Sequence, residues 1–283
     1  MELIQAKNIN YKYPINDGQS TLKNVNFSIQ RGELYSIIGK NGAGKTTLCN
    51  VIRGFIPHFH RGELDGELLI EGKDIREWDM SDLASKIGFI FQNPFTQISG
   101  VKDTVFDEIA YGLENLGVDI DDIKKRVEQI IDLLGIGDLA DKNPYELSGG
   151  QKQRVAFAAV IVMDPDILVI DEPTSQLDPK GTKDIFEIIK FLKEQGKTII
   201  LVEHKLELIA EHSDYVFVMN DGEIVLDGKV DEVLSMPKVL EYDAGLPQYA
   251  LLGIEMNRKD PSFNQIPINK SQAELEISKW LQR

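Results

Sequence analysis

Nine residues near the N-terminus have the types and the spacing of a loop that binds phosphate. They fit the pattern G-x-x-x-x-G-K-[ST] and are Gly39, Lys40, Asn41, Gly42, Ala43, Gly44, Lys45, Thr46 and Thr47. The glycines let backbone N–H groups face an anion, and Lys45 brings a positive charge to the β- and γ-phosphates. The Thr46 hydroxyl is a hard oxygen ligand for Mg²⁺. We therefore predict that this loop binds a nucleoside triphosphate.

The segments on either side of the loop supply the context that this motif requires. Residues 34–38 form an apolar run that predicts a short buried strand, and residues 48–53 predict a helix that ends near Gly54. A helix that follows the loop adds its dipole and its unsatisfied N–H donors to the phosphate site. Strand, glycine loop and helix in this order support the nucleotide-binding interpretation.

A second candidate anion site lies where residues 145–154 lead into an apolar helix predicted over residues 155–163. Its residues are Ser148, Gly149, Gly150 and Gln151. A Ser-Gly-Gly pattern alone is common in loops. A second helix start of this kind, separated from the first by a helical segment, is more informative and predicts another place for phosphate.

Four polar side chains follow predicted strands, where ligands of α/β sheets bind. They are Gln92, Asp171, Glu172 and His204. Because carboxylates at the end of a buried strand are costly without a role, we expect Asp171 to order Mg²⁺ through water and Glu172 to act as a general base. The Gln92 oxygen can reach a metal ion or a water, but without the other motifs the better interpretation is a surface Gln before a Pro turn. His204 can donate to a γ-phosphate. A single His is, however, more often structural.

Three further segments predict an antiparallel sheet beside the nucleotide loop. Residues 3–10 and 22–29 alternate apolar and polar side chains around a turn at residues 16–18, and residues 62–72 form a third strand. Tyr13 follows the first of these strands. Its ring can stack on adenine, and the alternative is an ordinary aromatic residue of a β-sheet.

Composition limits the class of protein. The chain has 283 residues, 27% of them charged, which suits one large α/β domain or one domain with a small appendage. The net charge of −15 argues against a general attraction to nucleic acid or anionic lipid. Cys49 is the only cysteine, so no disulfide forms within the chain, which fits a reducing cytosol. We see no signal peptide, and the longest apolar run is far short of the ~20 residues that cross a bilayer.

Two other regions complete the organisation. Residues 101–134 have helical periodicity broken by glycines at 112, 117, 135 and 137, which predicts a helical subdomain over about residues 95–165. Residues 237–270 show little periodicity, and residues 271–274 read as a capping box that starts a final helix. We expect one domain over residues 1–235 and an extension or linker over residues 236–283.

These motifs, in this order, resemble those of ABC-type ATPases over about residues 1–235. The resemblance implies an α/β P-loop fold with a mixed core sheet, an antiparallel β subdomain and a helical signature subdomain. It implies that two cassettes sandwich two ATP molecules head to tail, with Lys45, Thr46 and Thr47 on one side of each ATP. Ser148, Gly150 and Gln151 of the opposite cassette then close over the γ-phosphate. The resemblance makes Glu172 the catalytic base, His204 the γ-phosphate switch, Gln92 the sensor of metal and partner, and Tyr13 the adenine platform.

A finer resemblance is to the ATPases of energy-coupling-factor importers, carried by residues 91–97, 173–179 and 202–207. It implies ATP-driven import of a vitamin or a metal ion through a separate membrane protein, at the cytoplasmic face of the membrane. The second cassette can be an identical chain, a related chain, or a further part of the same native chain. The alternative function is an ABC-type ATPase that acts on ribosomes or DNA. A P-loop phosphotransferase is a third possibility, but it gives no role to residues 147–151.

Overall fold

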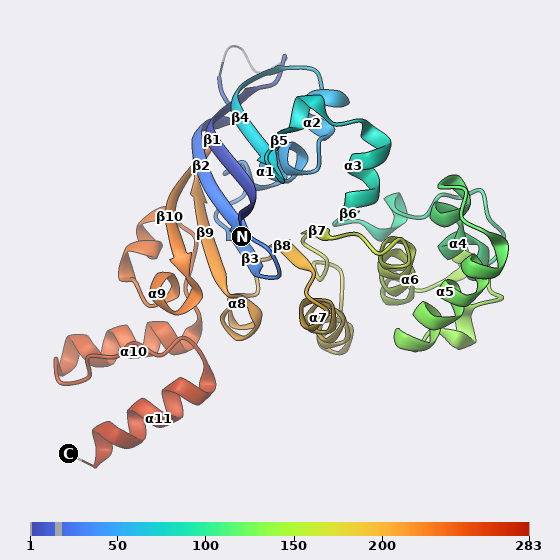
Figure 1. Ribbon diagram of the computed structural model, residues 1–283. Coiled ribbons are helices and arrows are strands. Elements are labelled where there is room, and N and C mark those ends of the chain that lie inside the picture. The colour runs from blue at the N-terminus through green and yellow to red at the C-terminus, as the bar shows by residue number, and fades with distance from the viewer. Residues whose placement is uncertain (1, 15–18, 283) are drawn as a thin grey trace. The chain divides into compact units, whose positions relative to one another are not determined.

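The computed structural model describes residues 2–14 and 19–282, and the turn expected at residues 16–18 lies outside this part (Figure 1). The chain forms two compact units. Unit 1 comprises Met1–Glu77 and Ile200–Arg283, and unit 2 comprises Trp78–Ile199. The domain boundary expected after residue 235 stays a prediction. Within the described part of the chain, no helix is both long enough and apolar enough to span a membrane.

The first sheet belongs to unit 1 and is antiparallel, as the alternating segments predicted. Its order is β2-β1-β4-β5, and β1, β2 and β4 run side by side in Figure 1. The strands are β1 (Glu2–Lys12), β2 (Leu22–Gln30), β4 (Glu63–Ile70) and β5 (Lys73–Asp74). Ala6 of β1 pairs with Phe27 on one side and with Leu68 on the other.

The second sheet is mixed, with the order β10-β9-β3-β8-β7-β6. Its strands are β3 (Leu34–Ile38), β6 (Ile87–Ile90), β7 (Ile167–Asp171), β8 (Thr198–Val202), β9 (Tyr215–Asn220) and β10 (Glu223–Lys229). β3 is parallel to β9, and β6 is parallel to β7, whereas β10 returns antiparallel to β9. Every residue of β3, β7 and β8 is buried, as expected of strands covered on both faces. The division between the units falls inside β8.

The helices of unit 1 include the one that starts at the phosphate loop and those of the C-terminal segment. They are α1 (Lys45–Ile52), α2 (Phe55–His58), α8 (Leu206–His212), α9 (Val230–Leu234), α10 (Gln248–Lys259) and α11 (Lys270–Leu281), with 3₁₀ turns η1 (Ile75–Glu77) and η5 (Pro237–Tyr242). Val239, Ala250 and Ile268 from the C-terminal segment pack with Ile209 of α8 and Val216 of β9 in one apolar cluster. The C-terminal segment is thus part of the core of unit 1.

Two expectations for the C-terminal segment need correction. Residues 237–270, which show little periodicity, contain helix α10, and this helix was not predicted. Helix α11 starts at Lys270 with Asn269 as its N-cap, so Ser271 is not the cap. The Asn269 side chain accepts the N–H of Gln272 at 3.0 Å, and the Gln272 side chain accepts the N–H of Ile268 at 2.8 Å. This pair satisfies two N–H groups at the helix start and fixes it two residues earlier than expected.

Unit 2 is built from helices around β6 and β7. They are α3 (Met80–Lys86), α4 (Val105–Asn115), α5 (Ile120–Leu133), α6 (Gly149–Ile161) and α7 (Pro179–Glu194), with 3₁₀ turns η2 (Pro94–Thr96), η3 (Gly137–Leu139) and η4 (Pro144–Glu146). The expected break at Gly112 is wrong, because Gly112 lies inside α4. A Cβ at Gly112 would lie 2.7 Å from the Met163 sulfur, so this glycine lets α4 approach the segment that follows α6.

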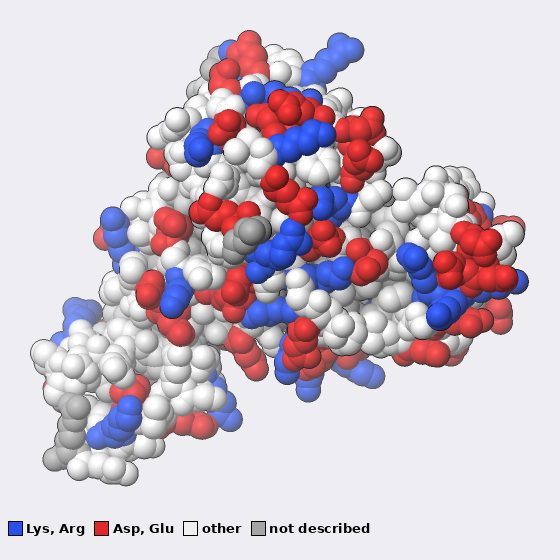
Figure 2. Space-filling model, viewed as in Figure 1, with Lys and Arg blue, Asp and Glu red and all other residues white. Residues whose placement is uncertain are grey.

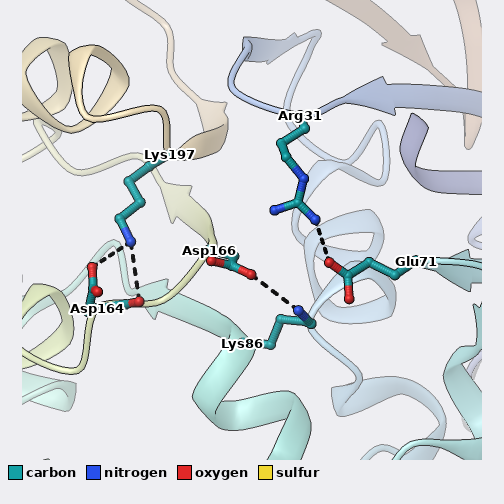
Figure 3. Close-up of polar contacts among 6 residues, drawn as sticks. All are labelled: Arg31, Glu71, Lys86, Asp164, Asp166 and Lys197. Carbon is teal, nitrogen blue, oxygen red and sulfur yellow. Dashed lines mark hydrogen bonds and ion pairs between the residues drawn. The ribbon is translucent and has the colours of Figure 1, made fainter. Parts of the chain in front are cut away.

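Ion pairs join segments within each unit (Figure 3). In unit 2, Lys197 donates to Asp164 at 2.5 Å and Lys86 donates to Asp166 at 3.2 Å. In unit 1, Arg31 pairs with Glu71. On the face shown in Figure 2, basic residues lie interspersed among acidic ones. Each of these pairs has at least one partner open to solvent and contributes little stability, so the apolar cores carry most of it.

Candidate nucleotide-binding and hydrolysis site

The phosphate loop of unit 1 has the backbone that its glycines predicted. It leaves the end of β3 and passes through Gly39 (φ 148°), Gly42 (φ 82°) and Gly44 (φ 103°), all in the region that disfavours side chains. Helix α1 begins at Lys45, earlier than the expected start at residue 48. Thr46 and Thr47 therefore lie in the first turn of α1, where free N–H groups and the helix dipole favour an anion.

Two of these glycines are required by their neighbours as well as by their backbone angles. A Cβ at Gly39 would lie 2.2 Å from the Met219 carbonyl oxygen, and one at Gly44 would lie 3.1 Å from the Thr21 carbonyl oxygen. At Gly42 a Cβ would meet no atom within 4 Å, so there only the backbone angle demands glycine. The loop is a cradle whose shape depends on residues of β9 and on the residue before β2.

The charged groups of the loop are held in specific places. Lys45 is only 5% exposed, and its Nζ donates to the carbonyls of Gly39 at 2.8 Å and Lys40 at 3.1 Å. The Lys40 ammonium lies 3.0 Å from Asp221 in the β9–β10 turn, and this hydrogen bond lowers the pKa of Asp221. Asn41 and Thr46 are exposed, while Ala43 is buried. The exposed Thr46 hydroxyl is accessible to a ligand, as a magnesium ligand must be.

Tyr13 lies beside the phosphate loop. Its hydroxyl is 3.4 Å from Thr47 Oγ1, and its ring packs at 82° to that of Tyr11, with centroids 4.7 Å apart. Burial and the neighbouring Tyr13 raise the pKa of Tyr11, whose hydroxyl donates to the Arg61 carbonyl. His60 also lies near Tyr13, with centroids 6.4 Å apart. No sequence pattern had pointed to His60, because it comes from the loop after α2.

His204 follows β8 in unit 1 and is exposed. Its neighbour Glu203 is only 3% exposed, and Glu203 Oε1 accepts the backbone N–H groups of His204 at 2.9 Å and Lys205 at 3.2 Å. The buried carboxylate thus fixes the turn that presents His204. Glu203 was not among the predicted site residues, although a carboxylate at the end of a buried strand is a usable signal in the sequence.

In unit 2, the parallel strands β6 and β7 bring Gln92 and Glu172 together. Ile90 pairs with Ile170 near the carboxyl ends of the strands, and Gln92 Nε2 donates to Glu172 Oε2 at 2.6 Å. Asp171 ends β7 and is 6% exposed. Glu172 is half-buried with a φ of 46°, an unfavourable angle for a residue with a side chain. Such strain is common at functional sites, and the sequence gave no sign of it.

The second candidate anion site, at the start of helix α6 in unit 2, is exposed. Ser148 caps α6: its Oγ accepts the N–H of Gln151, and its own N–H donates to Gln151 Oε1 at 2.9 Å. Ser148 lines an open pocket of about 460 Å³. The pocket is also lined by Gly149, Gly150, Gln151, Arg154, Gln176, Leu177, Asp178, Lys180, Gly181 and Asp184.

Two helix starts and two cations line this pocket, together with the carboxylates of Asp178 and Asp184. Asp178 caps α7, so the starts of α6 and α7 face one pocket with Arg154 and Lys180. Arg154 lies in α6 itself, six residues after Ser148, whereas Lys180 comes from α7 and reaches the pocket only through the fold. Among the described residues, no three His, Cys, Asp or Glu side chains form a metal-binding group. Thr46 in unit 1, and Gln92 and Asp171 in unit 2, each carry a side-chain oxygen of the kind that Mg²⁺ binds.

The family model described as "ABC transporter" matches residues 22–175, more than half of the chain. This range contains the phosphate loop, Gln92, residues 148–151 and the Asp171-Glu172 pair. The chain belongs to the ABC transporter family. This ABC cassette therefore binds ATP and hydrolyses it, and the resemblance inferred from the motifs is confirmed.

Relatives and solved structures agree with this assignment. The energy-coupling factor transporter ATP-binding protein EcfA2 of Clostridium perfringens is 39% identical over 285 residues, 97% of this chain and 98% of the relative. CbiO1 of Clostridium perfringens, described as part of the ABC transporter complex cbiONQ, matches with a TM-score of 0.74 and 32% identity, over 92% of this chain and 96% of that one. The ATP-binding cassette MJ0796, solved as a dimer in a post-hydrolysis state with ADP and Pi, matches with a TM-score of 0.69 and 28% identity, over 81% of this chain and 99% of that one.

Proposed function

We propose that this cassette is the ATP-hydrolysing subunit of an energy-coupling-factor importer for a vitamin or a metal ion. The support is its likeness to EcfA2 and to CbiO1, each named as part of a transporter and each matched over more than nine-tenths of its length. We also propose that it works at the cytoplasmic face of the membrane, bound to an integral membrane subunit. That subunit selects the substrate, and nucleic acid is not a partner.

The observation that carries the proposal is the exposed pocket at Ser148. Unit 2 presents the start of α6, with Arg154 and Lys180, to the outside of the chain, where an anion held by another molecule can enter. The MJ0796 cassette was solved as a dimer. We therefore propose that a second cassette, identical or related, brings its ATP to Ser148 and receives this chain's ATP in return.

The proposed roles follow from the chemistry of each group. The N–H groups of residues 39–47 and the Lys45 ammonium hold the phosphates, and Tyr13 stacks on adenine. Thr46, Gln92 and Asp171, the last through water, hold Mg²⁺, which when bound neutralises charge on the phosphates. Glu172 takes the proton of the attacking water, and His204 donates to the γ-phosphate. Ser148, Gly149, Gly150 and Gln151 contact the γ-phosphate of the opposite site.

Affinity purification from detergent-solubilised native membranes tests the importer role. The tagged chain is expected to bring down a second cassette and a multi-span membrane protein in comparable amounts, and the purified assembly is expected to hydrolyse Mg-ATP faster than the isolated chain. Recovery with ribosomes or DNA, and without a membrane protein, would establish the alternative function and refute this one. The mass of the second cassette in the assembly also distinguishes an identical chain, a related chain and a tandem chain.

A further inference from the structure

Lys152 is a buried lysine that the nucleotide chemistry leaves without a role. It follows Gln151 directly in α6 and is only 4% exposed. A buried ammonium is costly unless polar partners compensate for the water that it loses. The Lys152 Nζ donates to the Tyr145 carbonyl at 2.9 Å and lies 4.2 Å from the centroid of the Phe95 ring.

The Phe95 ring belongs to the segment that carries Gln92. Phe95 lies in η2, three residues after Gln92, and α6 packs against η2. The segment is tied internally, because Asn93 Oδ1 accepts the N–H of Phe95 at 3.0 Å and Gln97 Oε1 accepts the N–H of Phe91 at 3.2 Å. These two hydrogen bonds hold Gln92 and Phe95 in one internally bonded turn.

Lys152 thus connects the start of α6 with the Gln92 segment, and these two segments serve different nucleotides in the proposed dimer. Gln92 and Glu172, 2.6 Å apart, serve the ATP on this chain's own phosphate loop, whereas Ser148 serves the ATP of the opposite cassette. We propose that Lys152 is a positioning residue that couples the two ATP sites by fixing the start of α6 to the Gln92 segment. This inference rests on the proposed function, because the second ATP site, to which Ser148 contributes, exists only in the dimer.

The coupling depends on the contact between the Lys152 ammonium and the Phe95 ring, because the other partner of the ammonium, Tyr145, lies outside the Gln92 segment. A cation over a ring is worth more when it is desolvated; Lys152 is 4% exposed, whereas Phe95 is 52% exposed, so the contact is desolvated on the lysine side only. If the Gln92 segment moved without α6, the Lys152 ammonium would lose the ring and keep only its hydrogen bond to the Tyr145 carbonyl. Moving the two segments as one body avoids that cost, so a change at one ATP site repositions Ser148 at the other.

The test compares steady-state ATP hydrolysis in the native cassette assembly for four variants. Lys152→Met removes the charge and keeps the length, Lys152→Arg keeps a cation for the ring, and Phe95→Leu removes the ring and keeps the Lys152 bond to Tyr145. Lys102→Met is the matched control, because Lys102 lies 5.3 Å from the Tyr111 ring and bonds Glu114 without contacting either nucleotide segment. Two coupled sites allow a Hill coefficient of up to about 2 for ATP.

We expect Lys152→Met and Phe95→Leu to lower the Hill coefficient toward about 1, with ATP affinity of the isolated chain changed less than about threefold. Lys152→Arg should restore most of the cooperativity, and Lys102→Met should retain all of it. A parent Hill coefficient of about 1, or unchanged cooperativity in both Lys152→Met and Phe95→Leu, would overturn the inference. If Lys152→Met fails to fold, Phe95→Leu decides. Failure of the cassettes to associate in Mg-ATP, measured by light scattering, would instead overturn the proposed function.

Discussion

Replacing Glu172 by Gln is expected to separate ATP hydrolysis from ATP binding. The substitution removes the only carboxylate in the Gln92–Glu172 contact but keeps an oxygen that Gln92 Nε2, now 2.6 Å away, can still reach. Glutamine has nearly the same shape as glutamate, so the substitution does not change the strain of the left-handed backbone at residue 172. The side chain loses its ability to accept a proton from water.

The expected magnitudes differ widely between the two properties. A general base contributes roughly 10²- to 10⁴-fold in rate, or about 3–5 kcal/mol of activation free energy. Exchanging a charged for a neutral hydrogen-bond acceptor at a half-exposed position costs about 1 kcal/mol of folding stability or less. That cost lowers the melting temperature by no more than about 4 °C. Hydrolysis should therefore collapse while the fold and the ATP affinity persist.

Phosphate release in saturating Mg-ATP measures the rate, and calorimetry measures ATP binding and the melting temperature. The control is Glu108→Gln in α4, where a 4% exposed carboxylate accepts Ser99 N at 2.6 Å and Ser99 Oγ at 2.7 Å. This control should lose about 1–3 kcal/mol of stability and less than about tenfold in rate. A Glu172→Gln enzyme that keeps more than a tenth of the parent rate would refute the general-base assignment.

Three further substitutions test the phosphate loop and the second helix start. Gly39→Ala should abolish ATP binding and lower stability by about 1–3 kcal/mol, because its Cβ would meet the Met219 carbonyl; titration with ATP and thermal unfolding measure both. Asp221→Asn should strengthen ATP binding about twofold to fivefold at low salt by freeing the charge of Lys40, an effect that high salt removes. Lys40 lowers the pKa of Asp221 below its ordinary value of 3.8. The Lys40–Asp221 ion pair therefore persists above pH 3.8 and is lost as the pH falls through the lowered pKa. The ATP affinities of parent and variant should differ at pH 7 and converge in acid. Ser148→Ala should cost about 1 kcal/mol of stability through the lost cap, measured by denaturant unfolding, and should leave ATP binding to the isolated chain unchanged.

Much of the fold could be predicted because the phosphate loop and the buried strands have local signals. The loop needs three glycines in positive φ, and its motif places a glycine at each of these positions. Strands β7 and β8 are buried along their whole length and read as continuous apolar runs. These local signals, together with the family resemblance, correctly predicted an ABC-type ATPase.

The remaining features depend on contacts that the sequence does not display. Gly112 looked like a helix break, yet it lies inside α4, where its missing side chain leaves room for Met163. Ser271 looked like a cap, yet Asn269 takes that place because Gln272 completes a hydrogen-bonded pair with it. The positive φ of Glu172 arises where β7 ends, and no residue type announces it.

Mixing two inactive chains tests most directly whether Ser148 of one cassette completes the ATP site of another. Lys45→Gln damages only the phosphate loop and Ser148→Arg blocks only the second helix start, so each should be inactive as an identical pair. A mixed pair contains one site with both lesions and one intact site. If Ser148 of one cassette completes the ATP site of the other, ATP hydrolysis reappears when the two chains are combined. The rate of hydrolysis then grows with the fraction of mixed pairs. Mixtures as inactive as the separate chains, although mixed pairs form, would contradict it.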